Sequence, residues 1–381
     1  MKKLFTLIIL GLCILLFPAC TYSKEAENDI EYDMGTFISG KIPQLNYWTE
    51  RIYYPYQEDK ALVFKLYTPA YHNDIKRIDY IIFDSKTGKI IKTGIVNEKE
   101  LDYYRFFNIK TIQLKNGDIL FFEADENYVN LYVYIFSLKD FKVHDVGTYN
   151  LEKSRLSLYQ ISDDEIFIIG GDVNRERYVP KGNDVYILNL KTKQIKKIYS
   201  LKSYRYYLPK IKPYKDDKLL LVAKGGINFP YKHFSIFDIK TNSFKELLSV
   251  PIVESSEIKD FFIHNDTLVL EEQFEAYNVC SNEYRLRLYD IPTMKEIGFI
   301  NLNDFFPHEI YNRIVQLPNG NLLIAGGEYN RGIFFNFGKQ KIFIFDIDRQ
   351  KLIPVKNKLK INIHFKDLIL LNNGNVLMLD F

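Results

Sequence analysis

The feature of this 381-residue sequence that most restricts its fold is a repeat, which recurs about every 52 residues. The clearest copy starts with a polar turn at Asn319 and continues as an apolar strand that ends in Gly326-Gly327. A variable loop follows, and then a second apolar strand that ends in Asp346. A fixed period of this length is typical of repeat architectures. Because no long helical period accompanies it, the sequence argues against an α/β fold.

Two sequence markers define each copy. The first is a polar hairpin turn followed by a short apolar strand, and it occurs at residues 57–60, 115–118, 162–165, 215–218, 264–267, 318–321 and 372–375. Asn-Gly and Asp-rich turns supply the positive φ that tight hairpins require. The second marker is an apolar strand that ends in Asp or a substitute for it, namely Asp84, Ser137, Asn189, Asp238, Asp290 and Asp346. The second marker therefore occurs one time fewer than the first.

The start of the chain offers the strands that the last copy lacks. Around Asp33, the segment from Ile30 to Thr36 resembles the segment around Asp290 in character. We therefore predict an all-β fold, a seven-bladed β-propeller of four-stranded antiparallel blades. The last blade is expected to be closed by N- and C-terminal strands, which avoids open sheet edges. Residues 29–381 would form this single domain.

Double glycines end the second strand of three copies, at residues 170–171, 225–226 and 326–327. Together with the preceding Asn-Gly-type turns, they make the chain after residue 30 resemble the kelch family of β-propellers. The double glycine is missing from the copies with residues 122–124, 271–273 and 379–381. The downstream Trp of kelch repeats is absent as well, because the only Trp is Trp48. The resemblance implies a kelch-like propeller, and a propeller of another family is the alternative.

The N-terminal segment is typical of an export signal. A basic start, an apolar run from Leu4 to Phe17 and a small residue before Cys20 predict a signal peptide over residues 1–19. The apolar run is shorter than the roughly 20 residues that a membrane-spanning helix needs. The segment resembles the lipobox of bacterial lipoproteins, which implies that Cys20 carries lipid and that residues 20–28 form a linker. An ordinary cleaved signal with an incidental Cys is the alternative.

This resemblance implies a place in the bacterial cell envelope, anchored by lipid to a membrane on its periplasmic or surface side. Without Cys13 and Cys20, only Cys280 remains, so no intramolecular disulfide is available. The formal net charge of the whole sequence is only +3, and its Lys residues are scattered over predicted turns. The sequence therefore predicts no nucleic-acid partner and no polybasic membrane patch.

The long, variable loops between second and third strands are expected to lie on one face of the propeller. Loops on a rigid scaffold often carry function, and Arg binds carboxylates with two parallel hydrogen bonds. Three clusters in or beside these loops are candidates for binding an anionic or sugar-like ligand: Arg175, Arg177 and Tyr178; Tyr231 and His233; Glu328, Tyr329 and Arg331. The alternative is that they are solvated loop charges and packing aromatics.

Other chemistries lack their residue patterns. The six His residues have no metal-ligand spacing, and Cys280 has no Cys partner, so no metal or other cofactor is predicted. A phosphate-binding glycine loop and the Gly-x-Ser-x-Gly elbow of hydrolases are also absent from the sequence.

The leading hypothesis is a cell-envelope lipoprotein that acts as a kelch-like binding module for a protein, peptide or glycan partner. The alternative is a periplasmic sugar-acid-processing enzyme resembling kelch-type sialic acid epimerases. Such an enzyme needs converging acid and base groups, for example Glu176 or Glu328 with Arg175 or Arg331. A third hypothesis is a structural subunit of an envelope assembly, which predicts an exposed apolar patch. The sequence indicates neither the ligand nor the oligomeric state.

Overall fold

The computed structural model describes residues 38–41, 49–67, 77–87, 89–98, 109–124, 130–151, 154–171, 183–201, 207–224, 231–251, 256–275, 282–305, 313–327, 340–355 and 365–380. The chain divides into two compact units, residues 1–34 and 35–381, and every described residue belongs to the second. The predicted signal peptide, the linker and Cys20 therefore lie outside the described residues. Within the described ranges, no helix is long and apolar enough to cross a membrane.

Six four-stranded antiparallel sheets, called blades 1 to 6 in chain order, make up most of the described chain. Blades 1 to 3 consist of β2 (Thr49–Tyr56), β3 (Lys60–Tyr67), β4 (Arg77–Asp84) and β5 (Ile90–Glu98); β6 (Ile109–Gln113), β7 (Ile119–Ala124), β8 (Asn130–Ser137) and β9 (Lys142–Asn150); β10 (Ser154–Gln160), β11 (Glu165–Gly171), β12 (Asn183–Asn189) and β13 (Gln194–Leu201).

Blades 4 to 6 consist of β14 (Tyr207–Pro213), β15 (Lys218–Lys224), β16 (Tyr231–Asp238) and β17 (Ser243–Pro251); β18 (Ser256–His264), β19 (Thr267–Glu275), β20 (Asn282–Asp290) and β21 (Lys295–Asn301); β22 (Arg313–Gln316), β23 (Leu322–Gly327), β24 (Gln340–Asp346) and β25 (Lys351–Pro354). A short 3₁₀ helix, η1 (Leu302–Asp304), follows blade 5.

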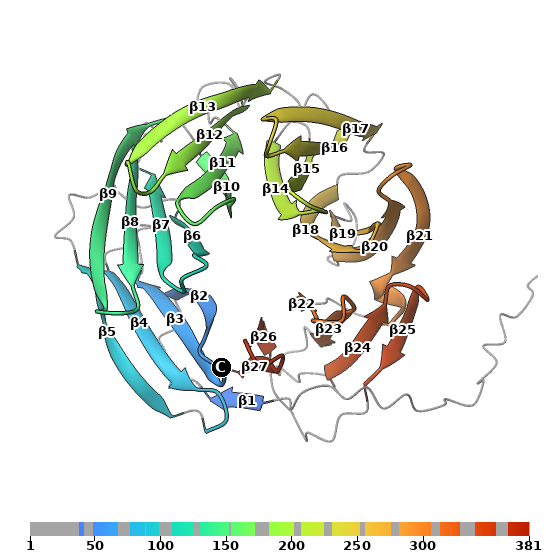
Figure 1. The fold of residues 1–381 in the computed structure, drawn as a ribbon. Helices are drawn as coiled ribbons and strands as arrows, with labels where there is room; N and C mark the ends of the chain where they lie inside the picture. The colour runs from blue at the N-terminus through green and yellow to red at the C-terminus, as the bar shows by residue number, and fades with distance from the viewer. Residues whose placement is uncertain are drawn as a thin grey trace, which may run out of the picture. The chain divides into compact units, whose positions relative to one another are not determined.

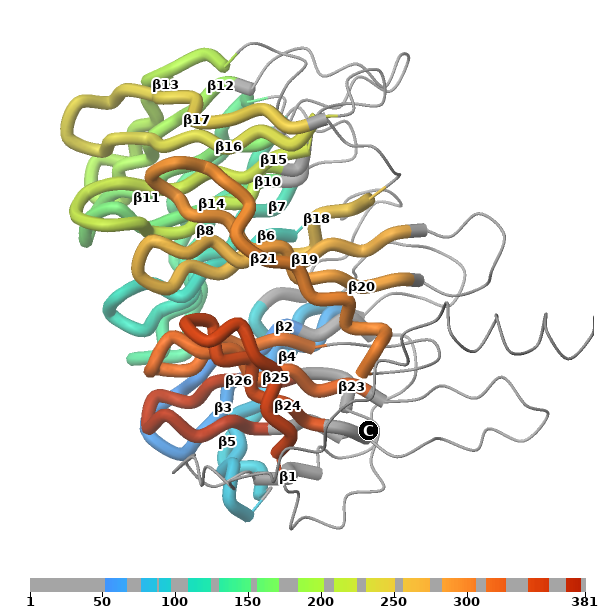
Figure 2. Tube along the Cα trace, turned by 90° about the vertical axis from the view of Figure 1, so that its right-hand side faces the viewer, coloured from blue at the N-terminus to red at the C-terminus, as the bar shows by residue number. Residues whose placement is uncertain are grey.

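The blades are arranged around an axis, and within each blade the strands follow the order of the chain from the inside outward (Figure 1). The first strands, such as β6, β14 and β18, lie nearest the axis. In the side view, the turns between first and second strands and between third and fourth strands lie at one end of the blades (Figure 2). The second strand of each blade therefore ends, and the third begins, at the opposite end, which we call the loop end.

The hairpin turns have the conformation that the sequence predicts. Gly117, Gly320 and Gly374 have φ values of +92°, +89° and +82°, which side chains rarely adopt. In the turns without glycine, Gln57 and Asn265 take positive φ instead. These turns fix the register of seven first-to-second-strand hairpins within the described residues.

The second strands form the core of each blade. In β7 every residue from Ile119 to Ala124 is buried, and in β15 the run from Leu219 to Ala223 is fully buried. This confirms the expectation, drawn from the continuous apolar runs, that these strands are covered on both faces. Hydrophobic clusters then join consecutive blades, from blades 1 and 2 through to blades 5 and 6.

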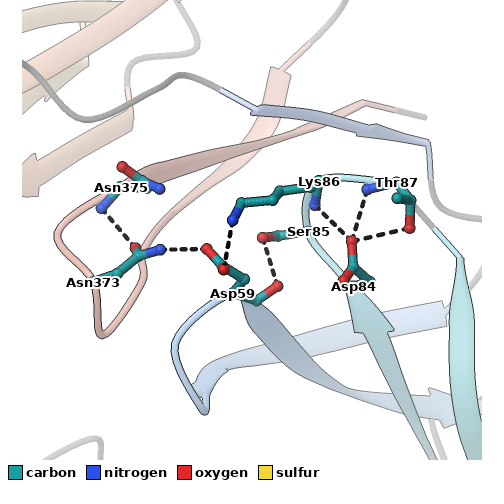
Figure 3. Close-up of polar contacts among 7 residues, drawn as sticks. All are labelled: Asp59, Asp84, Ser85, Lys86, Thr87, Asn373 and Asn375. Atoms are coloured by element: carbon teal, nitrogen blue, oxygen red, sulfur yellow. Dashed lines mark hydrogen bonds and ion pairs between the residues drawn. The ribbon is translucent and has the colours of Figure 1, made fainter.

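The Asp that ends the third strand in four of the six blades shapes the turn that follows. Asp84 accepts hydrogen bonds from the backbone N–H groups of Lys86 and Thr87 at 3.0 and 2.8 Å, and from the Thr87 hydroxyl at 2.9 Å (Figure 3). Asp238 accepts in the same way from the N–H of Thr241. Hydrogen bonds from the backbone and side chain of Thr87 lower the pKa of Asp84. The repeated Asp is therefore explained by local turn geometry.

The ends of the described chain correct the predicted blade count and closure. Six four-stranded blades are found in the described residues, and not seven. The remaining sheet has three strands, β1 (Ile38–Lys41), β27 (Val376–Asp380) and β26 (Phe365–Leu370), and β1 runs parallel to β27. The predicted closure by N- and C-terminal strands within a four-stranded antiparallel blade is therefore wrong. The segment around Asp33, which was expected to supply that strand, lies outside the described residues.

This three-stranded terminal sheet packs against blade 1. Ile369, Leu371 and Leu377 form a buried cluster with Ala61 and other residues of blade 1. At the turn end, the side-chain amide of Asn373 donates a hydrogen bond to Asp59, which also pairs with Lys86 (Figure 3). Apolar burial and turn contacts thus join the last sheet to the first blade.

Candidate functional site

A group of ionisable side chains on the inner strands of blades 4 to 6 is the strongest candidate site. We call it the inner-strand cluster, and it comprises Lys210 and Lys212 on β14, Asp260 on β18, Glu271 on β19, and Arg313 on β22. These residues are separated by up to two repeats in sequence. The propeller brings them together because it places the first strands of successive blades side by side around the axis.

Strand register places three of these residues at one level of the propeller. Lys210, Asp260 and Arg313 pair with Val222, Glu271 and Ala325 on the second strands of their blades. Val222, Glu271 and Ala325 pair in turn with residues of the third strands, namely Phe234, Leu286 and Ile342. Each of these third-strand residues stands the same number of residues before the Asp that ends its strand. Lys210, Asp260 and Arg313 therefore occupy equivalent positions in their blades.

Glu271 is the unusual member of the cluster. Its side chain is 8% exposed, and its carboxyl group makes no hydrogen bond or ion pair with any described residue. Burial raises the pKa of Glu271 to about 7, and repulsion from Asp260, directly across the strand pair, acts in the same direction. Lys210, Arg313 and Lys212 partly oppose this increase in the pKa. The carboxyl group can therefore gain or lose a proton near neutral pH.

The other acid of the cluster is paired. Lys212 Nζ lies 3.0 Å from Asp260 Oδ2. The same ammonium lies 4.3 Å from the ring centroid of Phe262, within the range of a cation–π contact. A bulge at Lys259 lies between the register positions of Ile258 and Asp260, and bulges often redirect side chains beside functional sites.

A second, buried ion network lies on the opposite face of β19, because successive strand residues point to opposite faces. Lys232 of blade 4 pairs with Glu272, whose carboxylate also accepts a hydrogen bond of 3.1 Å from Arg287 Nε. Arg287 continues to Glu296 at 2.8 Å. Burial lowers the pKa of Lys232, against the attraction of Glu272. Glu272 is fully buried and paired with two cations. Because Lys232 belongs to blade 4 and Glu272 to blade 5, this network links the two blades.

Blade 2 carries a related arrangement in which a tyrosine replaces the arginine. Glu123 occupies the position of Glu272 in the repeat and is 1% exposed. Tyr134, which stands where blade 5 has Arg287, donates a hydrogen bond to it. The position that carries glycine in blades 3 and 6 thus holds a buried acid in blades 2 and 5.

Two of the sequence-predicted site residues lie in described segments. Tyr231 begins β16 and is partly exposed, and its ring centroid lies 6.2 Å from that of His233. His233 is buried, with Nδ1 2.8 Å from Ser249 Oγ and 3.6 Å from Glu246 Oε1. The structure therefore places His233 within the sheet of blade 4. The remaining candidates lie outside the described residues: Cys20, Arg175, Arg177, Tyr178, Glu328, Tyr329 and Arg331.

The inner-strand cluster was missed by sequence reasoning, although one signal pointed to it. Glu271-Glu272-Gln273 was recognised only as a departure from the double-glycine pattern. Three polar residues inside a strand that is otherwise covered on both faces are unusual, because buried charges are unfavourable unless they are paired. Lys210, Asp260 and Arg313 carried no comparable signal, since each is one charge in a first strand.

Within the described part of the chain, no group of three or more His, Cys, Asp or Glu side chains is arranged to hold a metal ion. The arrangement of the cluster instead suits ligand binding or proton transfer. Its cations can hold an anion, and Glu271 can donate a hydrogen bond when protonated.

Comparison with solved structures identifies the architecture. A fungal alcohol oxidase of the AA5 family, solved with copper, matches with a TM-score of 0.56 and 12% identity over 86% of this chain and 71% of that chain. An uncharacterized protein from Listeria monocytogenes matches with a TM-score of 0.50 and 11% identity over 90% and 92% of the two chains. The fold is a β-propeller. At these identities, the likeness shows nothing beyond the fold.

The β-propeller domain of the Trilobed protease from Pyrococcus furiosus is also similar, with a TM-score of 0.47 and 12% identity over 86% and 88% of the two chains. No family model matches the sequence, and no curated protein matches it.

Proposed function

We propose that this chain is a lipid-anchored protein of the bacterial cell envelope whose kelch-like propeller acts as a binding module. Its partner is a protein, peptide or glycan that binds at the loop end of blades 4 to 6. The observation that carries this proposal is the inner-strand cluster, in which cations from two blades surround a buried acid at one level of the propeller. Arg175 and Arg331 stay candidate ligand-binding residues from the sequence, outside the described residues.

The physical case rests on rigidity and charge. The cluster stands on strands that pair through antiparallel ladders, so its geometry is set by the scaffold before a ligand arrives. Preorganised charges lose little conformational entropy on binding. We assign to the partner the cations on the first strands of the two flanking blades, Lys210 of blade 4 and Arg313 of blade 6.

One observation favours an enzyme as the second candidate. The pKa of Glu271, raised to about 7 by burial, suits a general acid or base at neutral pH. An enzyme of this kind, acting on a sugar acid, predicts turnover that the conservative Glu271→Gln change abolishes. A binding module predicts binding of the partner without any change in it.

Binding to glycan and peptide arrays tests the proposal. Lys210→Ala combined with Arg313→Ala is expected to weaken partner binding at least tenfold. The matched control, Lys196→Ala with Lys245→Ala, removes the same charge from exposed sites on the outer strands β13 and β17 and should leave binding unchanged. Equal loss in both doubles, or the absence of any bound partner, would contradict the proposal. Palmitate labelling that is lost in Cys20→Ala tests the lipid anchor separately.

A further inference from the structure

Two groups of the inner-strand cluster have no partner among the described residues. Buried polar groups in proteins are almost always hydrogen-bonded. Glu271 is only 8% exposed, yet its carboxyl group, which keeps some contact with solvent, makes no hydrogen bond with any described residue. Lys210, on the inner strand of the neighbouring blade, likewise makes no ion pair or side-chain hydrogen bond with any described residue. The cluster thus holds a carboxyl group and an ammonium group that have no protein partner, and one ligand group can pair with both.

Charged groups on three strands act on Glu271, whereas its partner on β20 is the apolar Leu286. Asp260 lies on β18, Lys210 and Lys212 lie on β14, and Arg313 lies on β22. Since Asp260 is neutralised by Lys212, Lys210 adds an unpaired positive charge to the surroundings of Glu271. A cationic surrounding favours an anionic ligand, and a protonated carboxyl group can donate the hydrogen bond that such a ligand accepts.

We infer that Glu271 and Lys210 form a carboxylate-binding subsite, in which a ligand carboxylate pairs with Lys210 and accepts a hydrogen bond from protonated Glu271. The proton comes from solvent and stays on Glu271, so the ligand and one proton bind together. Two carboxylates cannot share this space while both are ionised, because like charges at contact repel strongly in a buried site. This inference rests on the proposed function, since it names the chemistry that the binding module recognises.

The subsite predicts a definite dependence on pH. Because burial and Asp260 raise the pKa of Glu271 to about 7, most of the protein carries the proton at pH 6 and little of it does at pH 8. If only the protonated form binds, the affinity falls about tenfold between these two values. A ligand held by Arg and Lys alone should instead bind equally well at both pH values, because the charge of these side chains is constant over this range.

Isothermal titration calorimetry with galacturonate as the probe tests the inference. N-acetyl-L-glutamate is the second probe, and it distinguishes a sugar acid from an amino-acid carboxylate as the source of the group. The methyl ester of galacturonate, which lacks the charge, is the negative control. Wild-type protein should bind a carboxylate probe about tenfold more tightly at pH 6 than at pH 8. Buffers of different ionisation enthalpy should report uptake of one proton at pH 8.

Glu271→Gln is the decisive variant, because its amide donates a hydrogen bond at every pH. It should bind the probe with equal affinity at pH 6 and pH 8 and without proton uptake. Lys210→Ala should lose binding at both values, whereas Lys245→Ala on the outer strand should behave as wild type. Asp260→Asn, which removes the repulsion, should move the midpoint of the pH dependence to lower pH.

Three outcomes overturn the inference: no probe binds, wild-type affinity is the same at both pH values, or Glu271→Gln keeps the wild-type pH dependence. If any of these occurs while the arrays still show a partner that needs Lys210 and Arg313, the subsite fails and the proposed function stands. If the probes bind as expected but the arrays show no partner, the subsite stands and the binding module fails.

Discussion

At the scale of single residues, β19 carries two adjacent carboxyl groups, of which one has ion partners and the other has none. Glu272 is buried against Lys232 and Arg287, whereas Glu271 is buried without a partner. Since successive residues of a strand point to opposite faces, one acid joins blade 5 to blade 4 and its neighbour faces the cluster. Identical side chains at adjacent positions thus take part in a buried ion network and in the site that we propose for binding.

Removing one partner of the buried network should be costly. Glu272→Gln leaves Lys232 buried without its counter-charge, and we expect it to lower the free energy of unfolding by about 3 kcal/mol. The double change Lys232→Met with Glu272→Leu removes both charges and should recover most of that loss. Urea denaturation measures both, and a single variant as stable as wild type would show that the pair contributes nothing.

Glu271 should give the stability a distinct pH dependence. Its pKa in the folded state, about 7, lies above its ordinary value of 4.5, so the folded protein binds the proton more tightly than the unfolded chain. The favourable contribution is complete below pH 4.5 and is lost as pH rises through 7. Wild type should therefore lose up to about 3 kcal/mol relative to Glu271→Gln across this window. Parallel unfolding curves at pH 5 and pH 8 measure the difference, and an unchanged difference would argue against the raised pKa.

At the scale of elements, hairpin turns show how local sequence sets the repeat. Gly117 and Gly320 follow Asn in equivalent turns and have almost the same φ. Their surroundings differ, because a Cβ added to Gly117 meets nothing within 4 Å, whereas one added to Gly320 would lie 1.8 Å from His264 Nδ1. His264 belongs to blade 5, so the turn of blade 6 packs closely against its neighbour.

These two glycines provide a matched pair of substitutions. Gly117→Ala and Gly320→Ala share the cost of placing a side chain at positive φ, roughly 1–2 kcal/mol. Gly320→Ala must also displace the His264 ring from its contact with Asp348, which should add roughly 1–2 kcal/mol. Thermal denaturation compares the two, and equal losses would mean that the ring moves aside freely.

The elements could be predicted where the cause is local. Positive φ at Asn-Gly turns and the apolar second strands are properties of short segments, and both predictions were confirmed for the described residues. The Asp that ends four of the third strands was a marker in the sequence, and the structure shows that it caps the turn. The inner-strand cluster could not be predicted in this way. Lys210 and Arg313 become candidate site residues only once the fold places them in one cluster with Glu271. The relative placement of the blades cannot be read from any short segment of the sequence.

At the scale of the whole molecule, the terminal sheet shows another limit of pattern reasoning. The marker around Asp33 predicted an antiparallel partner for the last hairpin, but the observed partner is β1, from Ile38 to Lys41, and it is parallel. Apolar alternation predicts that a strand exists and which face it buries. It does not encode the direction of pairing, which depends on how the connecting chain runs.

Packing between the terminal sheet and blade 1 should be essential for stability at this junction. Leu377 is fully buried there, in a cluster with residues of blade 1 such as Val63. Leu377→Ala should cost about 2–5 kcal/mol and raise hydrogen exchange in β2 and β3. Ile95→Ala, at a site on β5 that is 44% exposed, is the control and should change little. Exchange that rises equally throughout all blades would show that the junction does not unfold separately.

The parallel pairing of β1 with β27 also determines how this junction would respond to a mechanical pull. In a parallel pair, the first residue of one strand and the last residue of the other lie at opposite ends of the ladder, here Ile38 and Asp380. A force that draws these two residues apart slides the strands along each other and stretches the whole ladder at once. An antiparallel pair pulled from its adjacent ends would instead open one hydrogen bond at a time. If the chain is tethered at its start, a pulling force therefore acts on the terminal sheet in shear. A short hydrogen-bond ladder withstands a larger force in shear than in any other direction.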